Sequence, residues 1–125
     1  MWDRRPTLFI EDVEKQITDG VKGMAGEALA GVITRSPVDE GTFRANHRVA
    51  VGGDGGEYDA SDHDEQGNAT LDRGMSIIDA IETPFVRVTI YNLSPYGQRL
   101  EDGWSQQAPG GIYEVTAASL QEKYR

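Results

Sequence analysis

Cysteine is absent from this 125-residue chain, which excludes disulfide bonds, thiolate catalysis and zinc sites built on cysteine. No apolar run approaches the roughly 20 residues that a membrane helix needs, and residues 1–6 lack the apolar segment of a signal peptide. Basic residues are scarce, with 12 Lys and Arg against 21 Asp and Glu and a formal net charge of −9. So acidic a chain lacks the basic face that broad phosphate or nucleic-acid binding requires.

The length suits one domain over residues 1–125, with a modest core. The excess negative charge is concentrated in a Gly-rich stretch at about residues 52–69, which has no Lys or Arg. We expect this stretch to be a mobile loop that is too polar to pack. Its six acidic residues are Asp54, Glu57, Asp59, Asp62, Asp64 and Glu65.

Residues 8–34 have the periodicity of a long helix, with apolar residues at steps of three or four. The helix must end by Ser36, because Pro37 disfavours helical geometry in the residue before it. Several glycines weaken the helix but would let a partner surface come close. The expected apolar stripe consists of Phe9, Val13, Ile17, Val21, Met24, Ala28 and Val32.

Two segments alternate as half-buried strands do, residues 43–51 and residues 85–91. Residues 37–41 read as a turn between helix and first strand, with Asp39 accepting backbone N–H groups and Gly41 supplying a positive φ. A helix is expected around residues 71–81, with Asn68 or Thr70 as its cap.

Beyond the second strand, Ser94 and Pro95 are typical of a helix N-cap and first helical residue, and Gly103 would end that short helix. Residues 108–111 predict another turn. A final helix is expected over residues 112–124, although residues 112–116 could instead be a strand.

The predicted fold class is α+β: a long N-terminal helix packed on a small, mostly antiparallel sheet with short helices. Two strands are too few for independent stability. Either a third strand is hidden in the sequence or neighbouring subunits complete the structure, which hints at oligomerisation.

A search for catalytic and metal-binding patterns finds none that holds. His47 reads as a packed or interface histidine; as a general base it has no Ser or Asp placed by the sequence. A calcium loop from Asp62 would need Glu at the position of Arg73. The glycines at 52–56 lack the Lys-Ser/Thr ending of a phosphate loop. Glu101 is either solvated or a buried carboxylate that needs a cation, for which Arg44 is the candidate.

Two stretches are more specific than composition. Residues 36–46 read Ser-Pro-Val-Asp-Glu-Gly-Thr-Phe-Arg-Ala-Asn. The second begins with Asn-Leu-Ser-Pro-Tyr-Gly at 92–97 and continues with Leu-Glu-Asp-Gly-Trp-Ser-Gln-Gln-Ala-Pro-Gly-Gly at 100–111. Together they resemble tailed-bacteriophage neck and tail-completion proteins, the family of minor tail protein Z and related putative tail components. The resemblance runs from about Leu8 to Leu120.

The resemblance implies a structural virion protein and neither an enzyme nor a cofactor. Such proteins form rings at the head–tail junction, where six or twelve copies are both plausible. The implied partners are further copies of the chain and the neighbouring portal, adaptor or tail proteins, with viral DNA passing through without sequence-specific binding and no membrane contact. Assembly would take place in the host cytoplasm.

Ring contacts join two different surface patches, each of which must be rigid. The prolines near the C-terminus would fix the loops, and the aromatic side chains would be anchors unless they fill the subunit's own core. Gln106 and Gln107 could bond backbone groups across a rim. The candidate interaction residues are Leu93, Pro95, Tyr96, Leu100, Glu101, Trp104, Ser105, Gln107 and Pro109; the structural turn comprises Ser36, Pro37, Asp39, Gly41 and Arg44.

The acidic loop could face the channel and repel passing DNA, or it could be a disordered outer loop. Two other functions compete with the virion role. A small acidic module could mimic nucleic acid to bind or inhibit a basic partner, although a mimic would spread its acids over ordered faces. A metal-assisted hydrolase using the Asp and His residues of the loop is the weaker alternative.

Overall fold

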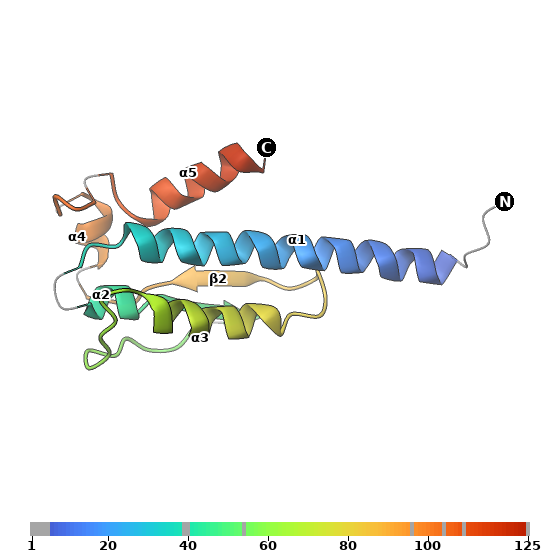
Figure 1. Cartoon of the computed structure of the whole chain (residues 1–125), viewed down its shortest axis with the longest axis horizontal. Coiled ribbons are helices and arrows are strands. Elements are labelled where there is room, and N and C mark those ends of the chain that lie inside the picture. Colours follow the sequence, from blue (N-terminus) through green and yellow to red (C-terminus); the bar gives the residue numbers. More distant parts are fainter. Residues whose placement is uncertain are drawn as a thin grey trace.

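A computed structural model describes residues 6–38, 41–53, 55–95, 97–103, 105–108 and 110–124, with side chains from Ile10 onward (Figure 1). The fold is α+β, as the sequence predicts, with a long N-terminal helix, a two-stranded antiparallel sheet and short helices. The elements are α1 (Pro6–Arg35), α2 (Thr42–Ala45), β1 (Arg48–Val51), α3 (Asn68–Asp79), β2 (Val88–Tyr91), α4 (Gly97–Glu101) and α5 (Tyr113–Lys123).

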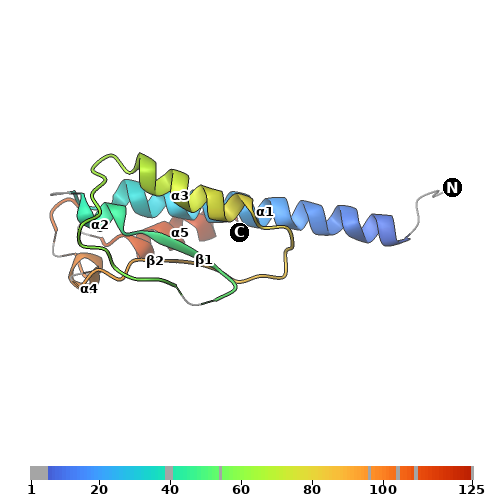
Figure 2. The same ribbon diagram turned by 90° about the horizontal axis from the view of Figure 1, so that it is seen from below.

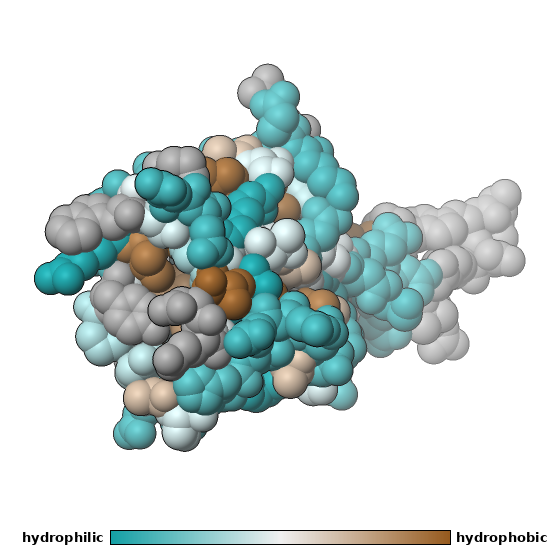
Figure 3. All heavy atoms as spheres, turned by 60° about the vertical axis from the view of Figure 1, so that its left-hand side comes forward, coloured by the Kyte–Doolittle hydropathy of each residue, from teal (hydrophilic) through white to brown (hydrophobic). Residues whose placement is uncertain are grey.

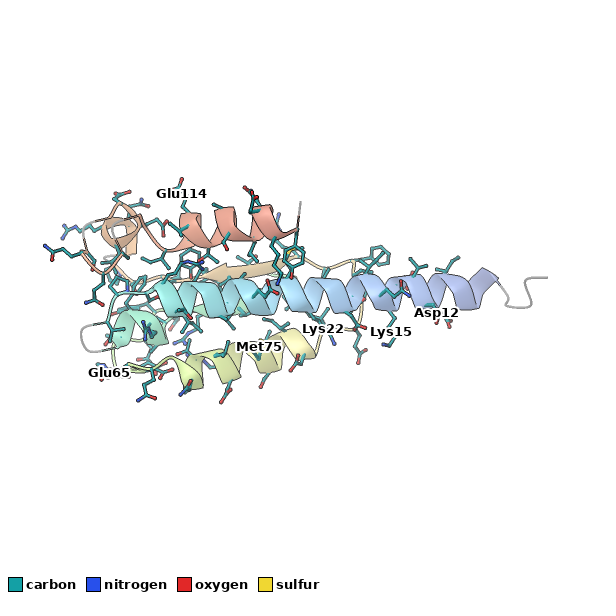
Figure 4. The ribbon with its side chains drawn as sticks, turned by 45° about the horizontal axis from the view of Figure 1, so that its top comes forward. Asp12, Lys15, Lys22, Glu65, Met75 and Glu114 are labelled. Atoms are coloured by element: carbon teal, nitrogen blue, oxygen red, sulfur yellow. The ribbon has the colours of Figure 1, made fainter. Side chains whose placement is uncertain are left out.

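The main core lies where α1 and α3 cover one face of the sheet (Figure 2). Leu29 of α1 and Ile78 of α3 are fully buried there. Gly74 permits the close approach of the two helices, because a Cβ atom at this position would lie 2.3 Å from Leu29 Cδ2. The side chain of Met75, a residue of α3, lies between α3 and α1 (Figure 4) and packs against the same cluster.

The strands pair in a register that places Val49 opposite Ile90 and Val51 opposite Val88. These four side chains pack against the helices, as the alternation of residues 85–91 predicts for β2. Among the described residues the sheet has no third strand. The chain therefore has the two-stranded sheet that the sequence identified as too small to be stable without further support.

A second core cluster joins the C-terminal end of α1 to α2 and α5. It consists of Val32, Phe43, Ala108 and Ile112, with Leu100 and Tyr113 among the partly buried residues around it. Gly31 allows α5 to approach α1, since a Cβ atom there would lie 2.8 Å from Thr116 Cγ2. Lys123 pairs with Glu27 near the other end of α5, so α5 is held along its length.

The prediction of a continuous strand over residues 43–51 is wrong in its first half. Thr42–Ala45 is a single helical turn, and β1 starts at Arg48. The side chain of Asn46 donates to Thr42 O at 2.8 Å and supports this turn. Three consecutive residues, Ala45 to His47, are buried, which breaks the alternation that a half-buried strand requires.

Helix caps also differ from the predictions. Neither Asn68 nor Thr70 caps α3; Gly67 precedes the helix with φ 86°, and the Asp64 carboxylate accepts the backbone N–H of Thr70 at 2.8 Å. Helix α4 begins at Gly97 rather than at Pro95. It is followed by Gly103, whose φ is 86°.

The C-terminal segment is helical from Tyr113 to Lys123, so the alternative of a strand at 112–116 is wrong. The turn at 108–111 is present, with Gly111 N donating to Ala108 O at 3.1 Å.

Only part of the predicted apolar stripe of α1 is buried. The helix itself is confirmed, and Val32 of the stripe is buried, but Val13, Ile17 and Met24 are 36%, 51% and 42% exposed. The side chain of Phe9 lies outside the described ones. The buried side chains belong instead to a neighbouring face with Ala25, Leu29 and Ile33. Figure 1 shows why: the N-terminal part of α1 projects beyond the other elements. Within the described part of the chain, no helix combines the length and apolar character needed to cross a bilayer.

Candidate interaction site

The two stretches that carry the family resemblance meet at the C-terminal end of α1. Gln107 joins them directly: its Oε1 accepts Val38 N–H at 2.8 Å, and its Nε2 donates to Val38 O at 3.2 Å. The Gln107 amide therefore bonds both backbone groups of Val38, as a residue of a neighbouring strand would. The sequence predicted backbone bonding by Gln107 across a rim, but these bonds lie within the chain itself.

Glu101 caps helix α5. Its carboxylate accepts the backbone N–H groups of Ile112, Tyr113 and Glu114 at 3.2, 2.8 and 3.0 Å. These are donors that a helix N-terminus leaves unsatisfied, and a negative charge there also complements the helix dipole. Gly111 precedes them with φ 90°, and a Cβ atom on it would lie 2.6 Å from Glu101 O.

The alternative of an ion pair between Glu101 and Arg44 is wrong, since Glu101 accepts backbone N–H groups and Arg44 donates to backbone carbonyls. Arg44 Nη2 donates to Ser36 O at 2.8 Å and Nη1 donates to Glu65 O at 2.6 Å. Arg44 therefore joins the end of α1 to the acidic stretch. Gly41 lies beside it with φ 82°, as predicted for the turn, and accepts Asp64 N–H at 3.0 Å.

A buried chain of hydrogen bonds runs through His47. Ser36 and His47 are 3% and 1% exposed. Ser36 Oγ donates to Val32 O at 2.6 Å, so its single proton is used there. His47 Nε2 must then donate to Ser36 Oγ, 2.5 Å away, and Nδ1 must accept the Tyr113 hydroxyl proton at 2.7 Å. The chain links α1, the α2–β1 connection and α5.

The direction of the hydrogen bond between Ser36 and His47 also bears on whether they could be a catalytic pair. A serine nucleophile must donate to the histidine that activates it, whereas Ser36 accepts from His47 and donates to a carbonyl. Burial, together with the charges of Arg44 and Arg48, lowers the pKa of His47 to about 3, so the imidazole is neutral in the folded protein. Burial, with Glu101 and Tyr91 nearby, raises the pKa of Tyr113. The cluster is a structural junction.

Two asparagines complete this junction. Asn92 Nδ2 donates to Phe43 O at 2.8 Å, and its Oδ1 accepts Ser94 N–H at 3.0 Å. Ser94 Oγ also donates to Asn92 Oδ1, so Ser94 stabilises a turn and does not cap a helix. Asn46, which is 1% exposed, exchanges two bonds with the backbone of Asp59 at 2.8 and 2.9 Å.

The acidic stretch is therefore attached to the body of the protein, and the prediction that it is too polar to pack is wrong. Besides the Asn46 contacts, Tyr91 Oη accepts Gly56 N–H at 2.5 Å. A Cβ atom on Gly55 would lie 2.0 Å from Tyr91 Cζ, so glycine is needed where the stretch crosses this ring. His63 Nδ1 lies 2.8 Å from Thr42 Oγ1.

The acidic residues of the stretch differ in their surroundings. Asp62 pairs with Arg48 and Arg73, each at 3.3 Å. Burial alone would raise the pKa of Asp64, but hydrogen bonds from Thr70 and Gly67 hold it below its usual range. Glu57, Asp59 and Glu65 are exposed, and Figure 4 shows Glu65 pointing away from the body. The hydrogen bonds from Ser61 lower the pKa of Asp59.

Several predicted interaction residues are used inside the subunit. Leu100 packs beside the second core cluster, and Ser105 Oγ accepts Gln107 N–H at 3.1 Å. Leu93, which is 52% exposed, and Pro95 remain on the surface. Figure 3 shows hydrophobic side chains gathered near the centre of this end of the molecule, with hydrophilic ones around them. Asp39, Asp54, Tyr96, Trp104 and Pro109 lie outside the described residues.

Beside this surface, an open depression of about 320 Å³ is lined by Phe43, Tyr91, Asn92, Glu101 and Tyr113, among others. Within the described ranges, no three His, Asp or Glu side chains are grouped so that they could hold a metal ion. Sequence reasoning missed the roles of Asn46, Asn92 and Tyr113. Both asparagines stand inside the quoted motifs, which is the signal that could have found them.

No family model matches the sequence, and comparison with curated proteins and with solved structures gave no match.

Proposed function

We propose that this chain is a structural protein of a tailed phage virion that forms a ring of six or twelve copies at the head–tail junction, joins tail to head and lets DNA pass. The observation that carries the proposal is the double hydrogen bond between Gln107 and Val38, which unites the two motif stretches. The described motif side chains bond backbone groups and so hold loops and helix ends in place. None of their described contacts forms a catalytic arrangement.

A ring subunit needs contact surfaces that keep their shape. Glu101 fixes the start of α5, and His47 ties α5 to α1. Asn92 fixes the segment that leads from β2 to the exposed Leu93 and Pro95. An exposed leucine on a segment with such support suits a contact with a neighbouring copy, or with a portal, adaptor or tail protein.

The acidic stretch supports a narrower role in the channel than the sequence suggested. Among its described residues, the exposed carboxylates are those of Glu57, Asp59 and Glu65, since Asp62 and Asp64 are bound within the subunit. We assign these exposed groups to repelling the phosphates of passing DNA. The alternative of a nucleic-acid mimic is less well supported. A mimic would spread its acids over ordered faces, whereas the excess of acids in this chain is concentrated in one stretch.

Genetic complementation tests this role. Deletion of the gene from the phage that encodes it is expected to leave heads and tails unjoined, and the wild-type gene is expected to restore joined particles. Leu93→Asp is expected to lower the titre at least about 100-fold, because a charge in a buried contact is costly. Glu114→Gln, at an exposed site on α5 (Figure 4), is the matched control and should restore full titre.

Circular dichroism of the purified Leu93→Asp protein should show the wild-type fold. A deletion phage that still produces joined, infectious particles would overturn the proposal.

A further inference from the structure

Phe85 is presented to solvent by a supported turn. Its side chain is 78% exposed, the largest fraction for a large hydrophobic residue in the described part of the chain. It lies in the connection from α3 to β2, where its backbone N–H donates to Thr83 Oγ1 at 3.2 Å. The residue between them, Pro84, has its φ angle fixed by its ring. An aromatic ring held out in this way gains free energy from a partner that covers it.

The open depression of about 320 Å³ at the other end of β2 has aromatic walls. Phe43, Tyr91 and Tyr113 line it, and the hydroxyl groups of both tyrosines are bonded within the subunit, so their rings are held in place. A cavity of about 150 Å³ is already large enough for a benzene molecule, and aromatic rings pack favourably edge to face. The depression therefore has the size and the lining that a phenyl ring requires.

These two features lie at opposite ends of the sheet. Figures 1 and 2 show the connection from α3 to β2 at one end of β2 and α4 at the other. Phe85 therefore cannot reach the depression of its own copy. Two different patches that fit each other join copies head to tail, and such a contact either closes into a ring or continues as a filament.

We propose that the depression bordered by β2, α4 and the start of α5 takes the Phe85 side chain of a second copy of this chain. The inference rests on the proposed function, because it names the two patches that would join neighbouring copies in the ring. Helix α1 projects beyond the connection from α3 to β2 (Figure 1), so its projecting half would lie along the neighbouring copy and add the exposed Ile10 and Ile17 to the contact.

The charges around the two patches are complementary. Glu82 and Arg87 are exposed on either side of Phe85, and Arg99 and Asp102 are exposed beside the depression. A ring that enters a depression leaves the rotation of one copy about it free. The charges favour the orientation that sets Arg87 near Asp102 and Glu82 near Arg99.

Sedimentation equilibrium of the purified chain measures the contact. The wild-type protein is expected to associate reversibly beyond a dimer, because each copy offers one Phe85 and one depression. Phe85→Ser should raise the dissociation constant at least about tenfold, because it removes the apolar surface that the contact buries. Gly97→Leu should do the same from the other side, since Gly97 lines the depression and a Cβ atom there would lie 3.8 Å from Phe43 Cε1, with room for a side chain.

The exposed charges test the orientation of the two copies. Arg87→Glu should raise the dissociation constant about three- to tenfold through repulsion by Asp102 of the second copy. The double variant Arg87→Glu/Asp102→Arg should return it to within about twofold of wild type. Asp72→Arg, with the same change of charge at an exposed position of α3, is the matched control for Asp102→Arg and should leave association unchanged.

Cross-linking shows whether the contact runs head to tail, and the absence of cysteine makes it specific. Arg87→Cys/Asp102→Cys, treated with a short bifunctional maleimide, should give a ladder of dimers, trimers and larger species. Arg87→Cys/Asp72→Cys is the matched control and should give at least about tenfold less of the species beyond the dimer.

A chain that stays monomeric at every concentration, or an association that Phe85→Ser does not weaken, would overturn this inference. Deletion of the gene tests the virion role separately. If the chain is monomeric but its deletion leaves heads and tails unjoined, the contact alone is wrong. If the chain associates through Phe85 but its deletion has no effect on particles, the virion role alone is wrong.

Discussion

The two halves of α1 differ sharply in their surroundings. Around the C-terminal half, Val32 and Leu29 are buried and polar side chains such as Ser36 and His47 are bonded in pairs. Around the N-terminal half, Ile10 and Ile17 are about half exposed on a helix that projects from the body (Figure 1). One helix with one periodicity thus contains a segment that completes the subunit's own core and a segment whose apolar face has no partner within the described chain.

This contrast indicates which part of α1 contributes to the stability of the isolated subunit. Substitutions at the C-terminal half should destabilise the isolated subunit, because each removes bonds within it. Substitutions at the N-terminal half should leave the isolated subunit almost unchanged.

Among the polar contacts, the largest effect is expected at the Glu101 cap. Glu101→Ala leaves three backbone N–H groups of α5 without their acceptor, and the free energy of unfolding should fall by about 3 kcal/mol. Urea denaturation measures this change. Asp102→Ala, at an exposed neighbouring position whose carboxylate accepts only from Gln98 among the bonds described, is the control and should cost much less. Equal losses in the two variants would contradict the capping role.

The buried histidine predicts a pH dependence. The pKa of His47 is lowered to about 3 in the folded protein against an ordinary value of 6.5, so the unfolded chain binds more protons below pH 6.5. The contribution of neutral His47 to the free energy of unfolding is therefore present above pH 6.5 and is lost as the pH falls. The loss is about 2 kcal/mol between pH 7 and pH 5. Urea titrations across this range should show the slope, and His47→Gln should flatten it. An unchanged slope in that variant would place its origin elsewhere.

A smaller effect is expected where the two motif stretches join. Gln107→Ala removes both bonds to Val38 at an exposed site, and we expect a loss of about 1 kcal/mol. Gln106→Ala, at the exposed position before it, is the control and should change stability by less than about 0.5 kcal/mol. Thermal unfolding followed by circular dichroism compares the two. If Gln106→Ala lowers the stability as much as Gln107→Ala does, the bonds to Val38 make no specific contribution to stability.

The smallest effect is expected on the projecting half of α1. Ile17→Ser should change the unfolding free energy of the monomer by less than about 0.5 kcal/mol, whereas Leu29→Ala in the buried half should cost about 2–5 kcal/mol. Urea denaturation at low protein concentration makes the comparison. A large loss with Ile17→Ser would mean that the projecting half is packed in solution, and the contrast between the halves would fail.

The sequence predicted the fold class, the length of α1 and the inward face of β2, because periodicity and proline positions act locally. It could not predict which face of α1 is buried, since Val21 and Met24 on one side and Ala25 and Leu29 on the other both recur at helical spacing. Tertiary packing decides between two such faces.

The site was harder to predict for a related reason. Glu101 and Gln107 bond backbone groups distant in the chain, and a backbone partner has no residue type that a sequence pattern could show. The cation that the sequence assigned to Glu101 was Arg44, which instead bonds two carbonyl oxygens. Residue chemistry left open whether Glu101 is solvated or needs a cation, and the structure shows backbone N–H groups as its partners instead.

The central proposal, that this chain is a virion component of the head–tail junction, is tested most directly by cryo-electron microscopy of purified particles of a phage whose genome carries this gene. The account predicts a ring of density at the portal vertex into which the α1, α3 and two-stranded-sheet arrangement fits, with the end that carries Leu93 and Pro95 against a neighbouring subunit. Mature particles that lack this polypeptide would contradict it.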